Sequence, residues 1–174
     1  MDPRPVLLSH GASGSAASMV PWVRGLAARG HAGETVPAEG RLPMRAERAI
    51  EVFRAQLEGR QNAVIGGVSY GGRVASMLAA QDRVGGLVLL SYPLHPPGKI
   101  DQQRVEHLPA LACPVLLLSG EADPFARLDL LRAAVELIPS AELHTYPRVG
   151  HGLTRDPTAF ADALDRIAAF VAAL

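Results

Sequence analysis

The sequence contains one cysteine, Cys113, so the chain cannot form a disulfide within itself. This excludes the small secreted scaffolds that depend on disulfides and fits a reducing compartment. We therefore expect a cytoplasmic protein. Cys113 directly precedes the apolar stretch PVLLLSG, which favours a buried small hydrophobic side chain over a nucleophile.

The sequence also lacks an excess of either charge and any long apolar run. Seventeen basic and seventeen acidic residues cancel, and neither sign forms a block. This argues against a nucleic-acid groove or an anionic membrane surface as partner, and favours a small-molecule substrate. No apolar run approaches the ~18 residues of a membrane helix, and the first residues lack a secretory leader pattern. We expect a soluble, unexported chain, whose oligomeric state the sequence does not indicate.

Short apolar segments alternate with amphipathic ones along 174 residues, of which 48% are hydrophobic. This length suits one hydrophobic core, so we expect a single domain over residues 1–174. Short apolar segments bounded by Gly, Pro or Asp predict buried strands at 5–10, 62–68, 84–92, 114–120 and 141–147, with a weaker one at 33–37.

Apolar residues recur at helical spacing between these strands. The pattern predicts helices at 20–29, 45–60, 72–81, 128–138 and 160–174. Strands without polar residues are covered on both faces, and helical crossovers make successive strands parallel. The predicted fold is therefore α/β, a three-layer α/β/α sandwich around a mostly parallel sheet.

One serine lies between glycines at the end of a predicted strand, in the stretch Gly67-Val68-Ser69-Tyr70-Gly71. This pattern fits the nucleophile elbow G-x-S-x-G, a strained strand-to-helix turn that exposes the serine hydroxyl. The following helix points its amino end at the serine, which favours developing negative charge there. A flexible turn is the alternative, because the five-residue pattern alone is not specific.

An acid and a histidine follow Ser69 in the order that this type of site requires. Asp123 comes just after the predicted strand 114–120, where its alternative role is an Asx-turn before Pro124. Glu121 is the fallback acid. His151 lies between two glycines after the last predicted strand, which suits a base reaching inward from a loop. We predict Ser69, Asp123 and His151 as the catalytic residues.

The first strand ends in LLSHGASGSA, at the place where this kind of fold supplies a backbone N–H for a developing oxyanion. We therefore predict the N–H groups of Ala12 and Tyr70 as the oxyanion hole, with His10 nearby as a substrate-binding residue. A phosphate-binding loop is the rival interpretation of GASGS. The spacing disfavours it, because neither G-x-G-x-x-G nor G-K-[ST] is present.

Five stretches together resemble a known family: HGASGSAASMVPWVRGLAARGH, GVSYGGRVASMLAA, LSYPLHPPGKI, CPVLLLSGEADPF and GHGL. Nearly end to end, the chain is similar to the α/β-hydrolase superfamily, and in particular to its small lidless group containing testis-expressed protein 30 and NSL complex subunit three, related to dienelactone hydrolases. The resemblance implies Ser69 as nucleophile, Asp123 as acid and His151 as base. Two features depart from it: dienelactone hydrolases place cysteine at the nucleophile, and the two strands that open many full-size members are missing.

Two function classes follow from these observations. The first is an esterase-type serine hydrolase that uses no cofactor or metal, and the second is a hydrolase-shaped, non-catalytic interaction protein. Only residues 93–113 separate two predicted strands where larger relatives insert a lid, so a large lid does not fit. Three prolines stiffen the start of this segment. We predict that it forms a rim over Ser69, with Leu94 and His95 touching substrate.

Overall fold

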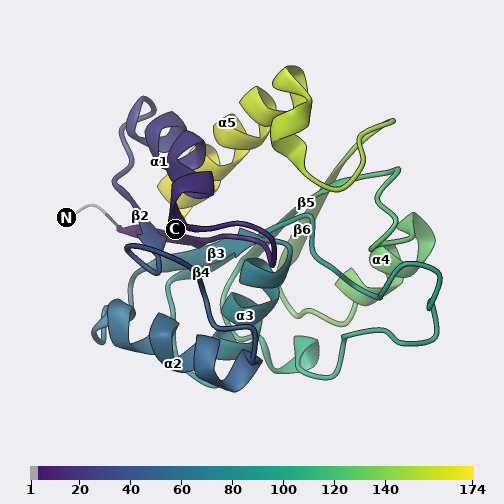
Figure 1. Ribbon diagram of the computed structural model, residues 1–174, viewed down its shortest axis with the longest axis horizontal. Helices are drawn as coiled ribbons and strands as arrows, with labels where there is room; N and C mark the ends of the chain where they lie inside the picture. Colours follow the sequence, from purple (N-terminus) through teal and green to yellow (C-terminus); the bar gives the residue numbers. More distant parts are fainter. Residues whose placement is uncertain (1–3) are drawn as a thin grey trace.

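The computed structural model describes residues 4–174, and these form one six-stranded sheet between two layers of helices (Figure 1). The strands are β1 (Val6–Ser9), β2 (Gly33–Val36), β3 (Val64–Val68), β4 (Gly86–Leu90), β5 (Val115–Gly120) and β6 (Ala141–Tyr146). The helices are α1 (Val20–Ala27), α2 (Ala46–Leu57), α3 (Tyr70–Ala79), α4 (Leu128–Val135) and α5 (Pro157–Ala173). Three short 3-10 turns lie at Ala16–Met19, Leu108–Ala110 and Leu153–Arg155.

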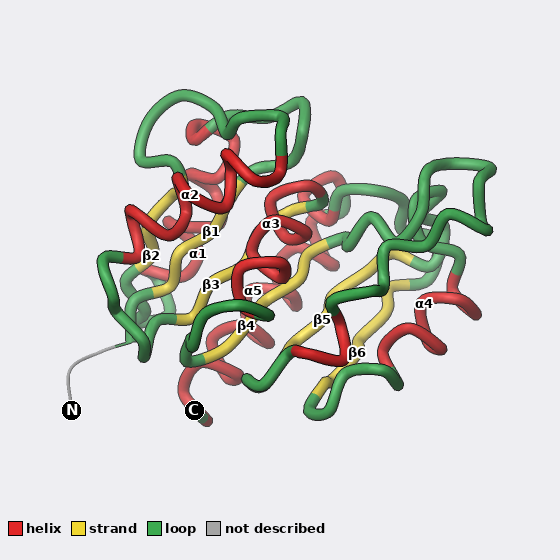
Figure 2. Tube along the Cα trace, turned by 90° about the horizontal axis from the view of Figure 1, so that it is seen from below, coloured by secondary structure: helices red, strands yellow, loops and turns green. Residues whose placement is uncertain are grey.

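All strand pairs are parallel, and the order across the sheet is β2-β1-β3-β4-β5-β6. The order is visible in Figure 2, where β1 and β3 lie side by side although β2 separates them in the sequence. The predicted α/β/α sandwich is confirmed, with every strand parallel. Because the carboxyl ends of parallel strands meet at one edge, the loops after β1, β3 and β5 converge there.

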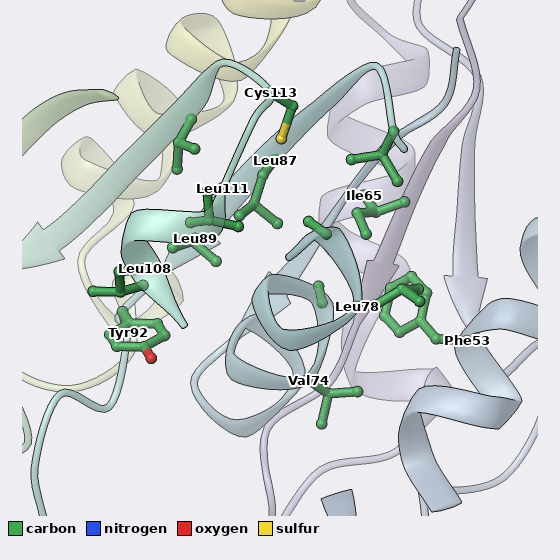
Figure 3. Packing of buried hydrophobic residues seen from close by; sticks show 14 of the residues in the cluster. Phe53, Ile65, Val74, Leu78, Leu87, Leu89, Tyr92, Leu108, Leu111 and Cys113 are labelled. Carbon is green, nitrogen blue, oxygen red and sulfur yellow. The ribbon is translucent and has the colours of Figure 1, made fainter. Parts of the chain in front are cut away.

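Two hydrophobic clusters fill the space on the two faces of the sheet. Helices α1 and α5 cover one face, where Trp22 packs edge to face on Phe160 with ring centroids 4.8 Å apart. Helices α2, α3 and α4 and the segment 92–113 cover the other face. Figure 3 shows Tyr92, Leu108 and Leu111 of that segment among the sheet and helix side chains. Both faces of the central strands are therefore buried against apolar side chains.

The edge strands differ from the central ones in burial. Strand β6 is exposed or half-buried along most of its length, whereas β4 and β5 are buried throughout. The weak strand predicted at 33–37 is the other edge, β2, whose polar residues are half-buried. An edge strand needs apolar residues on fewer positions, which explains why its sequence signal was faint.

Two observations concern membranes and metals. Across residues 4–174, no helix combines the length and the apolar character that crossing a membrane requires. Over the same range, His, Cys, Asp and Glu side chains do not gather in groups of three or more that could hold a metal ion. Cys113 is buried, as expected, and burial raises the pKa of its thiol.

Candidate active site

Ser69 occupies a strained turn between β3 and α3. Its backbone has φ 50° and ψ −117°, a conformation that a non-glycine residue rarely adopts. The turn is held in place because the Ser69 N–H donates to Leu90 O at 2.8 Å and the Arg73 N–H donates to Ser69 O at 3.0 Å. Helix α3 thus begins immediately after Ser69, two residues earlier than the sequence predicted.

The glycines around Ser69 make room for this turn. A Cβ on Gly67 would lie 2.4 Å from Ser9 O, and a Cβ on Gly71 would lie 2.5 Å from His10 O. Both distances are far inside van der Waals contact with backbone atoms that cannot move independently. The G-x-S-x-G pattern therefore reflects a close approach of the turn to the end of β1.

His151 bridges Ser69 and Asp123. Its Nε2 lies 2.9 Å from Ser69 Oγ, and its Nδ1 lies 2.7 Å from Asp123 Oδ2. The Asp123 side chain is fully buried, whereas the His151 side chain is 24% exposed and faces the serine. The structure thus brings together the three side chains that the sequence singled out, in one hydrogen-bonded row.

The loops after β5 and β6 position the acid and the histidine. A Cβ on Gly120 would lie 2.1 Å from Val149 O, so only glycine lets these two loops come this close. The Ala122 N–H donates to the same Val149 O at 2.9 Å. This contact sets His151, two residues after Val149, beside Asp123.

Phe125 supports both partners of this pair. Its N–H donates to Asp123 Oδ1 at 2.8 Å, which leaves Oδ2 for the histidine. Its ring lies against the His151 ring, with centroids 4.4 Å apart at an interplanar angle of 36°. Sequence reasoning missed this residue, because its contact with His151 depends on how the two loops pack.

Glu121, the fallback acid, points elsewhere. Its Oε1 accepts a hydrogen bond from Thr145 Oγ1 on β6 at 2.8 Å. The geometry therefore favours Asp123 as the carboxylate that serves His151.

The predicted oxyanion donors flank the serine. Tyr70 is the first residue of α3, so its N–H has no partner within the helix. The loop after β1 approaches from the other side, since a Cβ on Gly11 would lie 3.5 Å from Ser69 Cβ. Ala12, next in that loop, lines the same cleft as Ser69. Two backbone amides are thus available near one serine hydroxyl.

A cleft of about 630 Å³ opens beside Ser69 and His151. Met19, Trp22, Val68 and Phe125 supply its apolar lining, and Ser13, Ser18, Thr154 and Arg155 its polar lining. Within residues 4–174, Arg155 is the one lining residue with a permanent charge, and no carboxylate lines the cleft. Sequence reasoning assigned Met19 and Trp22 no role at the site, because apolar residues of a helix are expected in the core.

A larger cavity, about 820 Å³, lies at the amino ends of the strands, opposite the end that carries Ser69. None of the three site residues lines it. Its lining includes Asn62, which lies two residues before β3, and Gly85 and Pro114, which directly precede β4 and β5. Although it is the larger of the two, it offers no nucleophile aligned with a base. The cleft beside Ser69 is therefore the better candidate site.

The structure corrects the predicted contacts of Leu94 and His95 with substrate. Leu94 is completely buried within the hydrophobic cluster under α3, and His95 is 2% exposed. Neither residue lines the cleft. Pro93, Leu94 and His95 are buried, whereas residues 97–102 are exposed. No residue of the segment 93–113 lines the cleft, so the predicted rim is absent.

His10 is corrected in the same way. It is 1% exposed and does not line the cleft. Its Nδ1 lies 2.7 Å from Gly11 O, and its Nε2 accepts a hydrogen bond from the Leu42 N–H at 2.8 Å. Both ring nitrogens are engaged by backbone groups, so neither is free for substrate.

Comparisons with known proteins concern the fold of the chain. Among solved structures, the monoacylglycerol lipase of Paleococcus ferrophilus is similar to this chain with a TM-score of 0.79 at 14% identity, over 97% of this chain and 95% of that one. An esterase from Thermogutta terrifontis gives 0.72 at 18% identity, over 97% and 90%. A bromoperoxidase from Bacillus anthracis gives 0.76 at 14% identity, over 99% and 92%.

These identities are low, and the likenesses concern the fold. The family identification rests on the sequence itself, because the family model described as alpha/beta hydrolase domain matches residues 3–173. That range includes every residue of the Ser69 site. The chain is a member of the alpha/beta hydrolase domain family.

Proposed function

We propose that this protein is an esterase-type serine hydrolase that cleaves small acyl esters through an acyl-enzyme on Ser69. The observation that carries the proposal is the row Ser69 Oγ, His151 and Asp123, with contacts of 2.9 and 2.7 Å, at the strained end of β3. A nucleophile, a base and an orienting carboxylate in hydrogen-bond contact form the set that acyl transfer needs.

In the first half of the reaction, Ser69 Oγ attacks the ester carbonyl carbon while His151 Nε2 takes the hydroxyl proton. The N–H groups of Ala12 and Tyr70 donate to the resulting oxyanion, and Asp123 stabilises the imidazolium through Nδ1–H. As the tetrahedral intermediate collapses, the alcohol leaves with the proton from Nε2. The acyl group remains as an ester on Ser69.

In the second half, water replaces the alcohol. His151 takes a proton from the water, whose oxygen attacks the acyl carbon, and then returns the proton to Ser69 Oγ as the carboxylic acid leaves. Each step uses the same two amides and the same base. The net reaction breaks the ester C–O bond of the substrate and one O–H bond of water, and the enzyme returns to its starting state.

The cleft beside Ser69 limits what the acyl group can be. A volume of about 630 Å³ lies within the range of small-molecule sites, and its apolar lining suits a short acyl chain. We propose neutral small esters as the substrate class and a cytoplasmic setting. We also propose that the chain belongs with the small lidless group containing testis-expressed protein 30 and NSL complex subunit three, related to dienelactone hydrolases.

Hydrolysis of p-nitrophenyl butyrate by the wild type and by Ser69→Ala tests the proposal. Ser91→Ala is a matched control, because Ser91 also follows a strand with φ 50° but is fully buried, and its hydroxyl makes no hydrogen bond to His151 or any other described group. We expect turnover by the wild type and by Ser91→Ala, and its loss in Ser69→Ala. Absence of wild-type turnover, with a pure folded protein, would favour the non-catalytic interaction protein.

A further inference from the structure

Two buried histidines make the same set of contacts on the two sides of the site. His10 follows β1 and His95 follows β4, and they are 1% and 2% exposed. In each, Nδ1 lies against the carbonyl oxygen of the next residue, at 2.7 Å for His10 and 2.9 Å for His95. In each, Nε2 accepts a backbone N–H from a residue 32 positions later.

This pattern fixes the protonation of both rings. Because a backbone N–H can only donate, the Nε2 that faces it must be an unprotonated acceptor. The remaining ring proton is then on Nδ1, where it donates to the adjacent carbonyl. Both histidines are therefore neutral Nδ1–H tautomers, with no ring nitrogen left for substrate or proton transfer.

The Nδ1–H of His10 acts on the candidate oxyanion hole. The carbonyl that it contacts, Gly11 C=O, belongs to the same peptide group as the Ala12 N–H. A hydrogen bond to the oxygen of a peptide polarises the group and strengthens its N–H as a donor. It also fixes the peptide plane, which decides where that N–H points. His10 thus lies directly behind the predicted donor.

The other end of His10 is anchored to residues 40–43, between β2 and α2. Leu42 supplies the N–H to Nε2 at 2.8 Å, and the Arg41 guanidinium donates to Ala12 O at 2.9 Å. The Tyr70 hydroxyl donates to Pro43 O at 2.8 Å, and the Tyr70 N–H is the other predicted donor. Arg41 thus contacts Ala12, Leu42 contacts His10, and Pro43 contacts Tyr70, so three consecutive residues touch both sides of the predicted oxyanion hole.

His95 holds the loop that carries the acid. Its backbone N–H donates to Phe125 O at 3.0 Å, and its Nε2 accepts the Arg127 N–H at 3.0 Å. Phe125 in turn donates to Asp123 Oδ1 and lies against the His151 ring. The tie from His95 to this loop thus bears on the orientation of both Asp123 and His151.

We propose that His10 and His95 are positioning residues. Each uses a neutral imidazole ring to hold one part of the site, which we call a clamp: the oxyanion hole for His10 and the Asp123 loop for His95. His10 orients and polarises the Ala12 amide for the oxyanion, and His95 holds the Asp123 loop in register with His151. This inference rests on the proposed hydrolase function. It also explains why both residues are near the site although neither reaches the cleft.

Substitution of each histidine by asparagine or glutamine tests its two ring contacts separately. Asparagine places an amide near the position of Nδ1, and the longer glutamine places one near the position of Nε2. For His10 the decisive contact is Nδ1–H to Gly11 O, so His10→Asn should retain turnover and His10→Gln should have a lower kcat. For His95 the decisive contact is Nε2 with Arg127, so His95→Gln should retain turnover and His95→Asn should lose it.

The size and kind of loss also differ. Removing a whole oxyanion donor costs about 10²–10³ in kcat, so a misaligned one in His10→Gln should cost about tenfold or more, with KM unchanged. The low-field proton resonance of His151 Nδ1–H, which reports the contact with Asp123, should remain in His10→Gln and shift or vanish in His95→Asn. The control is His107→Gln, which removes a half-buried histidine whose Nε2 lies 2.7 Å from Ser76 Oγ, and it should change neither quantity.

The experiment measures kcat and KM with p-nitrophenyl butyrate and records this proton resonance for all five variants and the wild type. The crossed pattern supports the proposal, whereas equal activity of the asparagine and glutamine variants at both positions overturns it and leaves the hydrolase function intact. An inactive wild type instead overturns the proposed function. If a variant fails to fold, nitrogen chemical shifts of the wild-type rings decide, since a protonated Nε2 on either histidine contradicts the clamp.

Discussion

At the scale of single residues, Ser69 and His151 depend on each other for catalysis. The serine hydroxyl is a weak nucleophile until His151 Nε2, 2.9 Å away, takes its proton. Each alanine substitution, Ser69→Ala or His151→Ala, should therefore lower kcat/KM by about 10⁴-fold or more. The double variant should be scarcely worse than either single one, which steady-state kinetics will measure. Losses that multiply would show that the two residues act separately.

Much of this site was predictable from the sequence because the turn at Ser69 restricts the residues directly beside it. Gly67 and Gly71 are required by the turn at Ser69 itself, so the elbow has a short sequence pattern. The order of Ser69, Asp123 and His151 follows from which strand ends meet. The role of Phe125 was not predictable, since the contact of its ring with His151 depends on how two loops pack.

At the scale of elements, the segment after β4 belongs to the core. Leu94 is completely buried, so Leu94→Ala should lower the free energy of unfolding by about 2–5 kcal/mol through lost burial and a cavity. Because the side chain does not line the cleft, the dependence of kcat/KM on acyl length should stay as in the wild type. Denaturant unfolding measures the expected loss of stability, and a series of p-nitrophenyl esters measures the acyl-length dependence. A changed acyl preference in a variant of wild-type stability would restore the predicted rim.

His107, in the same segment, makes stability depend on pH. Burial, and secondarily the charge of Arg73, lower the pKa of His107 below its ordinary 6.5, while Glu106 acts in the opposite direction. The folded protein then binds fewer protons than the unfolded chain in the pH window just below 6.5, so stability falls on acidification through that window. Above it, both states hold His107 neutral and the effect is constant.

Replacing this histidine tests the linkage. In His107→Gln the loss of stability between pH 7.5 and pH 5.5 should be smaller than in the wild type, as measured by denaturant unfolding at both pH values. The wild type and the variant should show parallel behaviour above neutral pH. An identical pH dependence in the two proteins would mean that the pKa of His107 is the same in the folded and unfolded states.

Element types were readable in the sequence, whereas the direction of an irregular segment was not. The apolar periods of β3, β4, β5 and the helices survive in the structure with ends that shift by a few residues. The prolines after Tyr92 predicted a stiff segment but did not indicate which side chains would be buried. Leu94 and His95 turn inward because the sheet under them offers an apolar surface to cover, a property of the packed fold.

At the scale of the whole molecule, the lack of a lid decides how acyl length affects the rate. Each methylene gains ~0.8 kcal/mol only while it is being buried, and beyond the cleft the chain meets water. We expect kcat/KM to rise from p-nitrophenyl acetate to butyrate and to gain nothing further by octanoate. Emulsified triglyceride should be a negligible substrate. A rate that climbs steadily to long chains would require a deeper site than the cleft beside Ser69.

The sheet order shows what the whole fold adds to the sequence. Parallel strands with helical crossovers were predictable, but the placement of β1 between β2 and β3 was not, because strand periodicity carries no neighbour information. That order places the loop after β1 beside Ser69. It thereby brings Ala12 and His10, far apart from Ser69 in the sequence, to the side of the nucleophile.

Covalent labelling with a fluorophosphonate probe tests the central claim most directly, because the probe reacts with a serine that its base activates. Intact mass and peptide mapping should find one label per chain on Ser69 in the wild type. His151→Ala should label far more slowly, and Ser69→Ala not at all, while Ser91→Ala should match the wild type. An unlabelled wild type, or equal labelling of the wild type and His151→Ala, would contradict an activated serine at the end of β3.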